Sequence, residues 1–275
     1  MTRPADASRI DTTVAHPARR YNYWLGGKDN FAADRASGDR IAKAYPRVVT
    51  DAWASRGWMR RVARYLTDEQ GVRQFIDVGV GLPVAPNLHE IVQGINPTAR
   101  IMYVDNDPLV MSHARALLNS APQGATAYAE VDMHDTAKVL AEAKDLLDFD
   151  LPIAVLYCAV LHFVDDDQQA YDLVARTLNG LPSGSYVAIS NFTHDGLGPL
   201  ARWKIARLKK KRPADGQIRP RTRAQFTRFF DGLDLLHPGV RLVTDWRMDL
   251  GAEHEQQSKV AHVYGAVARK VGLSA

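Results

Sequence analysis

From residue 74 onward, the chain alternates short apolar runs with amphipathic stretches of helical periodicity. The apolar runs cover 74–78, 100–105, 125–131, 153–159 and 186–190. The helical stretches between them cover 84–94, 108–119, 136–148 and 168–179. Such alternation is typical of βαβ units, which build a parallel sheet with helices packed on its faces. The sequence therefore predicts an α/β fold with five parallel strands.

Two further β-like runs follow, at 240–246 and 262–268. The polar stretch between them, 249–259, is too short and too poorly patterned for a crossover helix. We therefore expect these two runs to form an antiparallel hairpin, which gives a mostly parallel sheet of seven strands. This count is higher than that of a simple nucleotide-binding Rossmann domain.

The N-terminal region lacks this alternation. Residues 1–15 show no periodicity and are predicted to be a flexible tail, whereas 16–70 has helical spacing. Its clearest stripe consists of Val48, Ala52, Met59, Val62, Ala63 and Leu66. The segment 21–30 combines aromatic residues with two adjacent glycines, which favours a ligand-covering loop over a plain helix; alternatively, its aromatics staple the helices to the sheet. We expect a helical lid or cap at 16–70 and the main domain at 71–275.

Composition narrows the class of protein. The 275 residues, 46% of them hydrophobic, suffice for one large α/β domain with an appendage. A single cysteine, Cys158, excludes an internal disulfide and any multi-cysteine zinc site, and it fits a reducing cytoplasm. No apolar run approaches the roughly 20 residues of a membrane span, and the N-terminus lacks the pattern of a signal peptide. We therefore expect a cytoplasmic protein without a membrane partner and without a bound metal.

A glycine-rich turn, DVGVGLP at 77–83, ends the first predicted strand. Gly79 and Gly81 would let the backbone approach a ligand closely, and the following helix would present free N–H groups. A tight strand-to-helix connection explains such a turn equally well. With Asp77, these glycines are the first candidate cofactor-binding residues.

Polar residues after the second and third predicted strands strengthen the binding interpretation. Asp105, followed by Asn106, can accept the hydroxyls of a ribose. Asp132 can take the exocyclic amine of adenine, while the N–H of Met133 can reach a ring nitrogen. Any one of these acids could simply cap a helix. Because the carboxyl ends of parallel strands share one edge, however, we expect them to line a common crevice.

The same turn favours S-adenosylmethionine (SAM) over NAD. A dinucleotide fingerprint requires a third glycine at position 84, where this chain has Val84 preceded by Pro83. Pro83 removes an N–H donor that a pyrophosphate would use, whereas SAM has no phosphate. The sequence therefore predicts SAM as the cofactor.

The chain resembles an actinobacterial family of SAM-dependent methyltransferases, long catalogued as a domain of unknown function. The resemblance runs from about Ala18 to Lys270, and its most specific block is ARRYNYWLGGKDNFAADR at 18–35. The further matches are FIDVGVGLP at 75–83, YVDNDP at 103–108, AVLHFV at 159–164, RFFDGL at 228–233 and YGAVARK at 264–270. The resemblance implies the Rossmann-like class I methyltransferase fold and SAM binding, but no substrate. Val80 stands where the family usually has threonine, which removes a hydroxyl but no backbone contact.

Three residues from the matching blocks are further site candidates. Tyr21 could offer a π face to the sulfonium or to the adenine. Ala159 follows the fourth strand and is expected to contact the cofactor. His162 could serve as a general base for a hydroxyl or amine nucleophile, or it could be a buried imidazole that orders the loop.

A basic segment follows the fifth predicted strand. Its eleven cationic residues are Arg202, Lys204, Arg207, Lys209, Lys210, Lys211, Arg212, Arg219, Arg221, Arg223 and Arg228. A solvated surface accounts for such a segment, and the alternative is a site for an anionic acceptor or a nucleic-acid backbone. The sequence has no Asp-Pro-Pro-Tyr-like run after the fourth strand, which speaks against methylation of DNA bases.

The sequence thus favours a SAM-dependent methyltransferase that acts on an O or N atom of a small molecule, either neutral or anionic. Two alternatives stay open: a catalytically silent SAM-binding module, and a nucleic-acid methyltransferase that uses the segment 202–228. An open cavity beside the methyl position would favour the enzyme, and a filled one would favour the silent module. The acceptor and the oligomeric state are not predicted.

Overall fold

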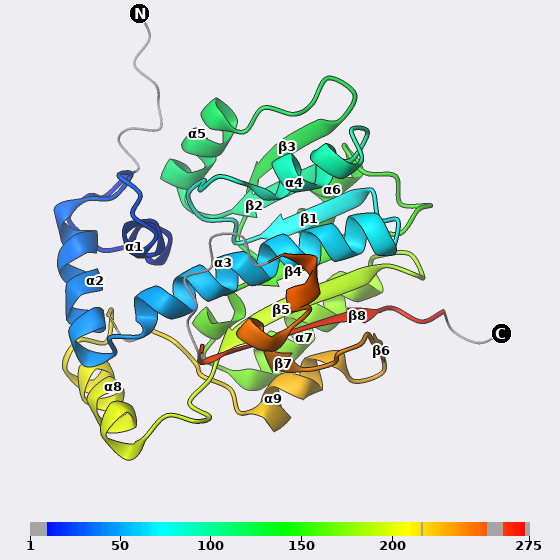
Figure 1. Ribbon diagram of the computed structural model, residues 1–275. Coiled ribbons are helices and arrows are strands. Elements are labelled where there is room, and N and C mark those ends of the chain that lie inside the picture. Colours follow the sequence, from blue (N-terminus) through cyan, green and yellow to red (C-terminus); the bar gives the residue numbers. More distant parts are fainter. Residues whose placement is uncertain (1–9, 216, 252–260, 273–275) are drawn as a thin grey trace, which may run out of the picture.

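A single sheet forms the centre of the computed structural model, which describes residues 10–215, 217–251 and 261–272 (Figure 1). Five strands are parallel: β1 (Gln74–Val78), β2 (Arg100–Asp105), β3 (Ala125–Glu130), β4 (Ala154–Cys158) and β5 (Tyr186–Phe192). Three are antiparallel: β6 (Asp234–Leu235), β7 (Arg241–Leu242) and β8 (Val263–Arg269). The strand order is β3-β2-β1-β4-β5-β8-β6, and β7 pairs with β8. The five predicted parallel strands are confirmed.

The order of the strands determines where a ligand site can form. The chain runs outward from β1 to β2 and β3, then crosses back to add β4 on the other side of β1. The connections that leave β1 and β4 therefore diverge to opposite faces of the sheet. In open α/β folds, this switch point opens a crevice at the carboxyl ends of the strands.

Helices cover both faces of the sheet (Figure 1). One face carries α3 (Val48–Arg64), α4 (Leu88–Ile95) and α5 (Pro108–Leu117), and the other carries α6 (Thr136–Lys144), α7 (Asp167–Asn179) and α9 (Arg223–Thr227). Successive strand residues point to opposite faces. Accordingly, Phe75 of β1 packs in the cluster with Trp58 and Val62, whereas Ile76 packs in the cluster with Leu173 and Val174. Burial on both faces explains why these strands are apolar throughout.

Three helices lie beyond the carboxyl edge of the sheet: α1 (Pro17–Trp24), α2 (Ala32–Ala44) and α8 (Pro199–Lys211). Asp34 joins the first two, because its carboxylate accepts the N–H groups of His16 and Phe31 (2.8 and 2.9 Å). The expectation of a loop over 21–30 is therefore wrong for its first part, since Tyr21 to Trp24 form the last turn of α1. Short turns complete the structure: a π-helical one at Tyr65–Glu69, and 3-10 ones at Leu161–Phe163, Arg228–Phe230, Val243–Asp245 and Met248–Leu250.

Two other expectations need correction. The antiparallel pairing near the end of the chain is confirmed, but only Arg241–Leu242 of the predicted run 240–246 is a strand. The chain then turns into a 3-10 helix, because the buried Arg61 guanidinium donates hydrogen bonds to the backbone carbonyls of Val243 and Trp246. The sheet has eight strands in the described residues rather than seven, since β6 is too short to show a period.

The helix predicted at 84–94 begins later, at Leu88, where the Glu90 carboxylate accepts the N–H of Asn87 and caps the first turn. Residues 1–9 of the predicted tail lie outside the described residues, and Ile10 packs against the core. None of the described helices is both long enough and apolar enough to span a membrane.

The packing of α3 on β8 gives a stability prediction. A methyl group on Gly265 would lie 2.6 Å from a ring atom of Trp58, which is fully buried and packs edge-on against Trp246. We expect Gly265→Ala to lower the free energy of unfolding by about 1–3 kcal/mol through overpacking. Urea unfolding measures this change.

Gly94→Ala is the matched control, because a methyl group there meets no atom within 4 Å and the residue is helical. It should raise stability by about 0.4–1 kcal/mol. Equal effects of the two substitutions would contradict the packing described.

Candidate functional site

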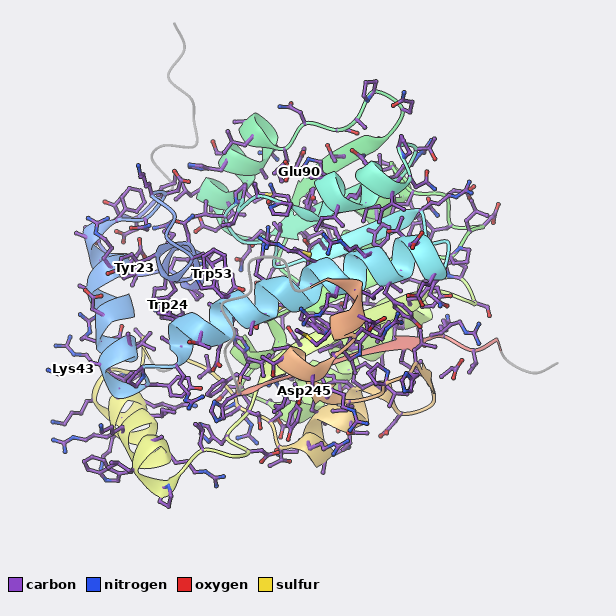
Figure 2. All side chains as sticks on the ribbon, viewed as in Figure 1. Tyr23, Trp24, Lys43, Trp53, Glu90 and Asp245 are labelled. Carbon is purple, nitrogen blue, oxygen red and sulfur yellow. The ribbon has the colours of Figure 1, made fainter. Side chains whose placement is uncertain are left out.

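A cavity of about 380 Å³ lies at the switch point, and its walls come from the strand ends and from α1, α2, α3 and α8. All ten residues predicted from the sequence line it: Tyr21, Asp77, Gly79, Gly81, Asp105, Asn106, Asp132, Met133, Ala159 and His162. Figure 2 shows Trp24, another lining residue, on the inner side of α2, whereas Lys43 extends from its outer side. The fold thus brings residues from four strand ends and the N-terminal helices to one hollow.

The glycine turn presents open backbone to the cavity, but not N–H groups. Gly79 and Gly81 have positive φ angles of 72° and 65°, which favour glycine. The N–H groups of Gly79 and Val80 both donate to the Val104 carbonyl, and that of Gly81 donates to Asp105 (2.9 Å). These three N–H groups are therefore not available to a ligand, and the helix that was expected to present free N–H groups begins seven residues after Gly81, at Leu88.

The two glycines serve different needs. A methyl group on Gly79 would lie 2.4 Å from Val160, so glycine allows the turn to pack against the loop after β4. A methyl group on Gly81 would meet only Ala18, at 4.0 Å, and would project into open space beneath α1. A cofactor can therefore approach the backbone closely at Gly81.

Asp105 organises this part of the cavity from the end of β2. It is 7% exposed, and its two oxygens accept the N–H groups of Gly81 and Asp107, each at 2.9 Å. Burial raises the pKa of Asp105, although both hydrogen bonds oppose that shift. Each oxygen retains acceptor capacity toward the cavity.

Asp77 is buried at the end of β1 without an ion pair in the described part of the chain. Burial raises its pKa to about 7; Arg56 opposes the shift and Asp105 adds to it. Burial and the nearby Asp77 also hold the pKa of the Cys158 thiol well above its usual value, so the thiol stays protonated. A cation bound here would favour the charged form of Asp77.

Asp132 lies at the exposed rim of the cavity. Its carboxylate accepts hydrogen bonds from the backbone N–H of His134 (2.9 Å) and from the Asn106 amide (3.4 Å), and it pairs with the His134 ring (2.7 Å). Burial acts to raise the pKa of Asp132, but these contacts outweigh it and leave the pKa below its usual value. The adenine end of the predicted site is thus the end open to solvent.

Ala159, after β4, has a left-handed backbone with a φ of 55°, a conformation that costs about 1–3 kcal/mol for a residue with a side chain. Its N–H donates to the Ser190 hydroxyl on β5 (2.9 Å), which holds the conformation. Such strain is concentrated at functional sites.

His162 lines the cavity, but its surroundings keep it neutral. Burial, with a smaller contribution from Arg221, lowers its pKa to about 3. Its Nδ1 atom is buried and has no hydrogen-bond partner among the described residues. A group with this pKa is a weak proton acceptor near neutral pH, which weighs against the general-base hypothesis.

Tyr21 and its neighbours are firmly tied to the body of the protein. The Tyr21 hydroxyl donates to the Ala52 carbonyl on α3 (2.8 Å), and burial raises its pKa. The Asn30 amide donates to Asn22 and to the Gly27 carbonyl (both 2.9 Å), which closes the loop after α1. These contacts fit the alternative that the aromatic residues fasten the N-terminal helices to the sheet at least as well as they fit a ligand-covering loop.

Sequence reasoning missed the part of the cavity under α3 and α8. Asp51 and Ser55 lie one helical turn apart on α3 and line the cavity. Val48, Ala52 and Met59, which the periodicity assigned to a core stripe, also line it. The available signal in the sequence was the carboxylate of Asp51, which directly precedes Ala52 of the apolar stripe.

The basic segment is mostly engaged in the structure itself. Arg221 is fully buried and donates to two carbonyls and to Asn191, while Arg219 pairs with Asp167 (2.9 Å). On α8 the lining positions are Ile205 and Leu208, so the charges of that helix lie on its other faces. Arg219 and Arg221 thus have structural roles, and the solvated-surface interpretation fits the charges on α8.

The residues present fit SAM better than a dinucleotide. The turn offers close approach at Gly81 and a carboxylate at Asp105, but the N–H groups of Gly79, Val80 and Gly81 are already bonded and so are not available to a pyrophosphate. The unpaired buried carboxyl of Asp77 suits the amino group of a methionine moiety.

Comparison with solved structures agrees with this fit. A DUF574 family protein from Streptomyces avermitilis MA-4680 is 41% identical and has a TM-score of 0.86, and the match covers 95% of this chain and 100% of that one. A proposed methyltransferase from Thermobifida fusca YX is 32% identical with a TM-score of 0.83, covering 95% and 97%. The plantazolicin methyltransferase BpumL, solved with S-adenosylhomocysteine, shares the fold at 12% identity and a TM-score of 0.51, covering 93% of this chain and 95% of its own.

Sequence families give the same answer. The family model described as S-adenosyl methyltransferase matches residues 3–271, and no curated protein matches the chain. Because that match spans nearly the whole chain and both solved relatives are at least 32% identical over 95% of it, the chain belongs to the S-adenosyl methyltransferase family, as a SAM-dependent methyltransferase with the class I fold.

Proposed function

We propose that this methyltransferase acts on an O or N atom of a small molecule bound inside the cavity, next to the cofactor. The single observation that carries the proposal is that one cavity holds both the ten predicted residues and a further region under α3 and α8. A filled space beside the cofactor residues would instead have favoured a silent module. Since α8 directs its charges away from the cavity, nothing in its lining favours a nucleic-acid acceptor.

Each part of the cofactor has a proposed partner. Asp105, with Asn106 beside it, would accept the ribose hydroxyls, and Asp132 with the N–H of Met133 would hold the adenine. Gly79, Gly81 and Ala159 would surround the methionine part, whose amino group Asp77 would attract. When bound, SAM supplies a methyl group activated by a positive sulfur. Tyr21 would cover this region, with its ring held by the Ala52 carbonyl.

The protein's own contribution would be alignment and the exclusion of water. Methyl transfer requires the nucleophile to lie in line with the bond that breaks, so positioning supplies much of the rate. The buried walls from α1 and α3 would fix the two molecules relative to each other. His162, neutral at working pH, would serve as part of the wall rather than as the base.

Asp105→Ala tests the ribose assignment. We expect the Kd for SAM and for S-adenosylhomocysteine, measured by isothermal calorimetry, to rise about 10- to 100-fold, since each hydrogen bond to a charged group contributes about 1.5–3 kcal/mol. Asp172→Ala, an exposed acid on α7, is the control and should bind as the wild type does. An unchanged affinity in a folded Asp105→Ala variant would remove the assignment.

Asp77 predicts a pH dependence of binding. With its pKa at about 7, the carboxyl is largely protonated at pH 6, and a cationic amino group favours the ionised form. SAM affinity should therefore rise with pH between about 5.5 and 7.5, by at most about tenfold per unit.

The same titration of Asp77→Asn should give a nearly flat profile, because the amide does not ionise. Binding of SAM to the wild type at pH 6.5 should also release protons, which calorimetry in buffers of different ionisation enthalpy detects. Proton uptake, or an equal slope in the variant, would count against this role.

A further inference from the structure

The cavity continues beyond the proposed cofactor contacts into an apolar region. Tyr45, Val48, Phe192, Ile205 and Ile218 pack together as one cluster, and all five also line the cavity. They come from α3, β5 and α8 and from the segments that follow α2 and α8. We call these five residues the acceptor compartment.

One carboxylate borders this compartment. Asp51 lines the cavity and is 5% exposed. Its Oδ2 accepts the Tyr45 hydroxyl (2.6 Å) and its Oδ1 accepts the backbone N–H of His262 (3.0 Å), while the Tyr45 hydroxyl also contacts His262 Nδ1 (2.8 Å). Each carboxylate oxygen has two acceptor positions, so Asp51 can accept a further hydrogen bond from the cavity.

The environment of Asp51 favours such a donor. Burial raises its pKa to about 6, against the two hydrogen bonds and the charge of Arg47. A buried carboxylate gains stability from each additional hydrogen-bond donor. A ligand hydroxyl or N–H would supply one.

Two arginines of the cavity wall donate to neutral groups of the protein. Arg20 donates to the Ser37 hydroxyl and the Ala214 carbonyl, both at 3.3 Å. Arg56 donates to the Val84 carbonyl and to Asn87. The charge of Arg56 acts on Asp77 and Cys158, at the strand ends, and neither arginine is hydrogen-bonded to the five residues of the compartment. An anion in the compartment would therefore meet apolar side chains and the Asp51 carboxylate.

We propose that the acceptor compartment binds an uncharged, mainly apolar molecule that donates an O–H or N–H hydrogen bond to Asp51. This deepens the proposed function and rests on it, since the compartment is assigned to the methyl acceptor. It also narrows the sequence-based expectation, which left an anionic acceptor open.

The test uses three probes of one size on the full chain without cofactor. They are 1-naphthol, which has a hydroxyl donor; 1-methoxynaphthalene, which lacks it; and 1-naphthoate, which is an anion. Calorimetry or ligand fluorescence gives each Kd. We expect 1-naphthol to bind at least about tenfold more tightly than either of the others, the difference made by one hydrogen bond to a charged group. Binding of 1-naphthoate as tight as that of 1-naphthol would overturn the proposal.

A matched pair of variants on α8 locates the site. Ile205 lines the cavity, whereas Leu200 on the same helix is 65% exposed and does not, and α8 buries no residue, so neither change threatens the core. Ile205→Glu should weaken 1-naphthol binding at least tenfold and Leu200→Glu should leave it unchanged. Equal binding by the two variants would overturn the location.

Asp51→Asn addresses the hydrogen bond. The preference for 1-naphthol over 1-methoxynaphthalene should shrink to about twofold, and a full preference in a folded variant would overturn the role of Asp51. If this variant does not fold, the three probes on the wild type and the two α8 variants still test the proposal. Titration with SAM separates the two proposals: SAM binding without 1-naphthol selectivity overturns this inference alone, while selectivity without SAM binding supports the site and removes the proposed function.

Discussion

The cavity depends on a short chain of hydrogen bonds that starts at Asp105. This buried carboxylate accepts the N–H groups of Gly81 and Asp107, and so joins the glycine turn after β1 to the end of β2. Asp107 in turn accepts the N–H of Leu109 at the start of α5 and pairs with the Arg19 guanidinium of α1 (3.2 Å). One pair of acids thus fixes the strand ends, a crossover helix and the N-terminal helices relative to one another.

This arrangement divides the cavity by chemistry. The side along β1, β2 and β3 carries carboxylates and open backbone, whereas the side under α3 and α8 is mainly apolar and includes the polar Asp51 and Ser55. Burial raises the pKa of both Asp77 and Asp51 and lowers that of His162, so near neutral pH His162 is neutral, Asp77 is partly protonated and Asp51 is mostly ionised. Such a site favours ligands that bring their own positive charge to Asp77 and a neutral donor to Asp51.

The sequence correctly grouped the strand-end residues that line one cavity, because parallel strands bring their carboxyl ends to one edge whatever their separation along the chain. Gly81, Asp105 and Asp132 could therefore be grouped without coordinates. The other side could not: Tyr45 and His262 are brought together by the packing of α3 on β8, and no local period reports that contact. The turn at Val243 was missed for a related reason. The Val243 carbonyl accepts a hydrogen bond from the side chain of Arg61, which is distant in sequence, and not from a neighbouring strand.

The most direct test of this division is a crystal structure of the protein with S-adenosylhomocysteine. The account predicts ribose hydroxyls within hydrogen-bond distance of Asp105, adenine at the rim near Asp132, and Asp51 and Phe192 free of the cofactor. S-adenosylhomocysteine bound among Tyr45, Phe192 and Ile205, and too far from Asp105 for a hydrogen bond, would contradict the account.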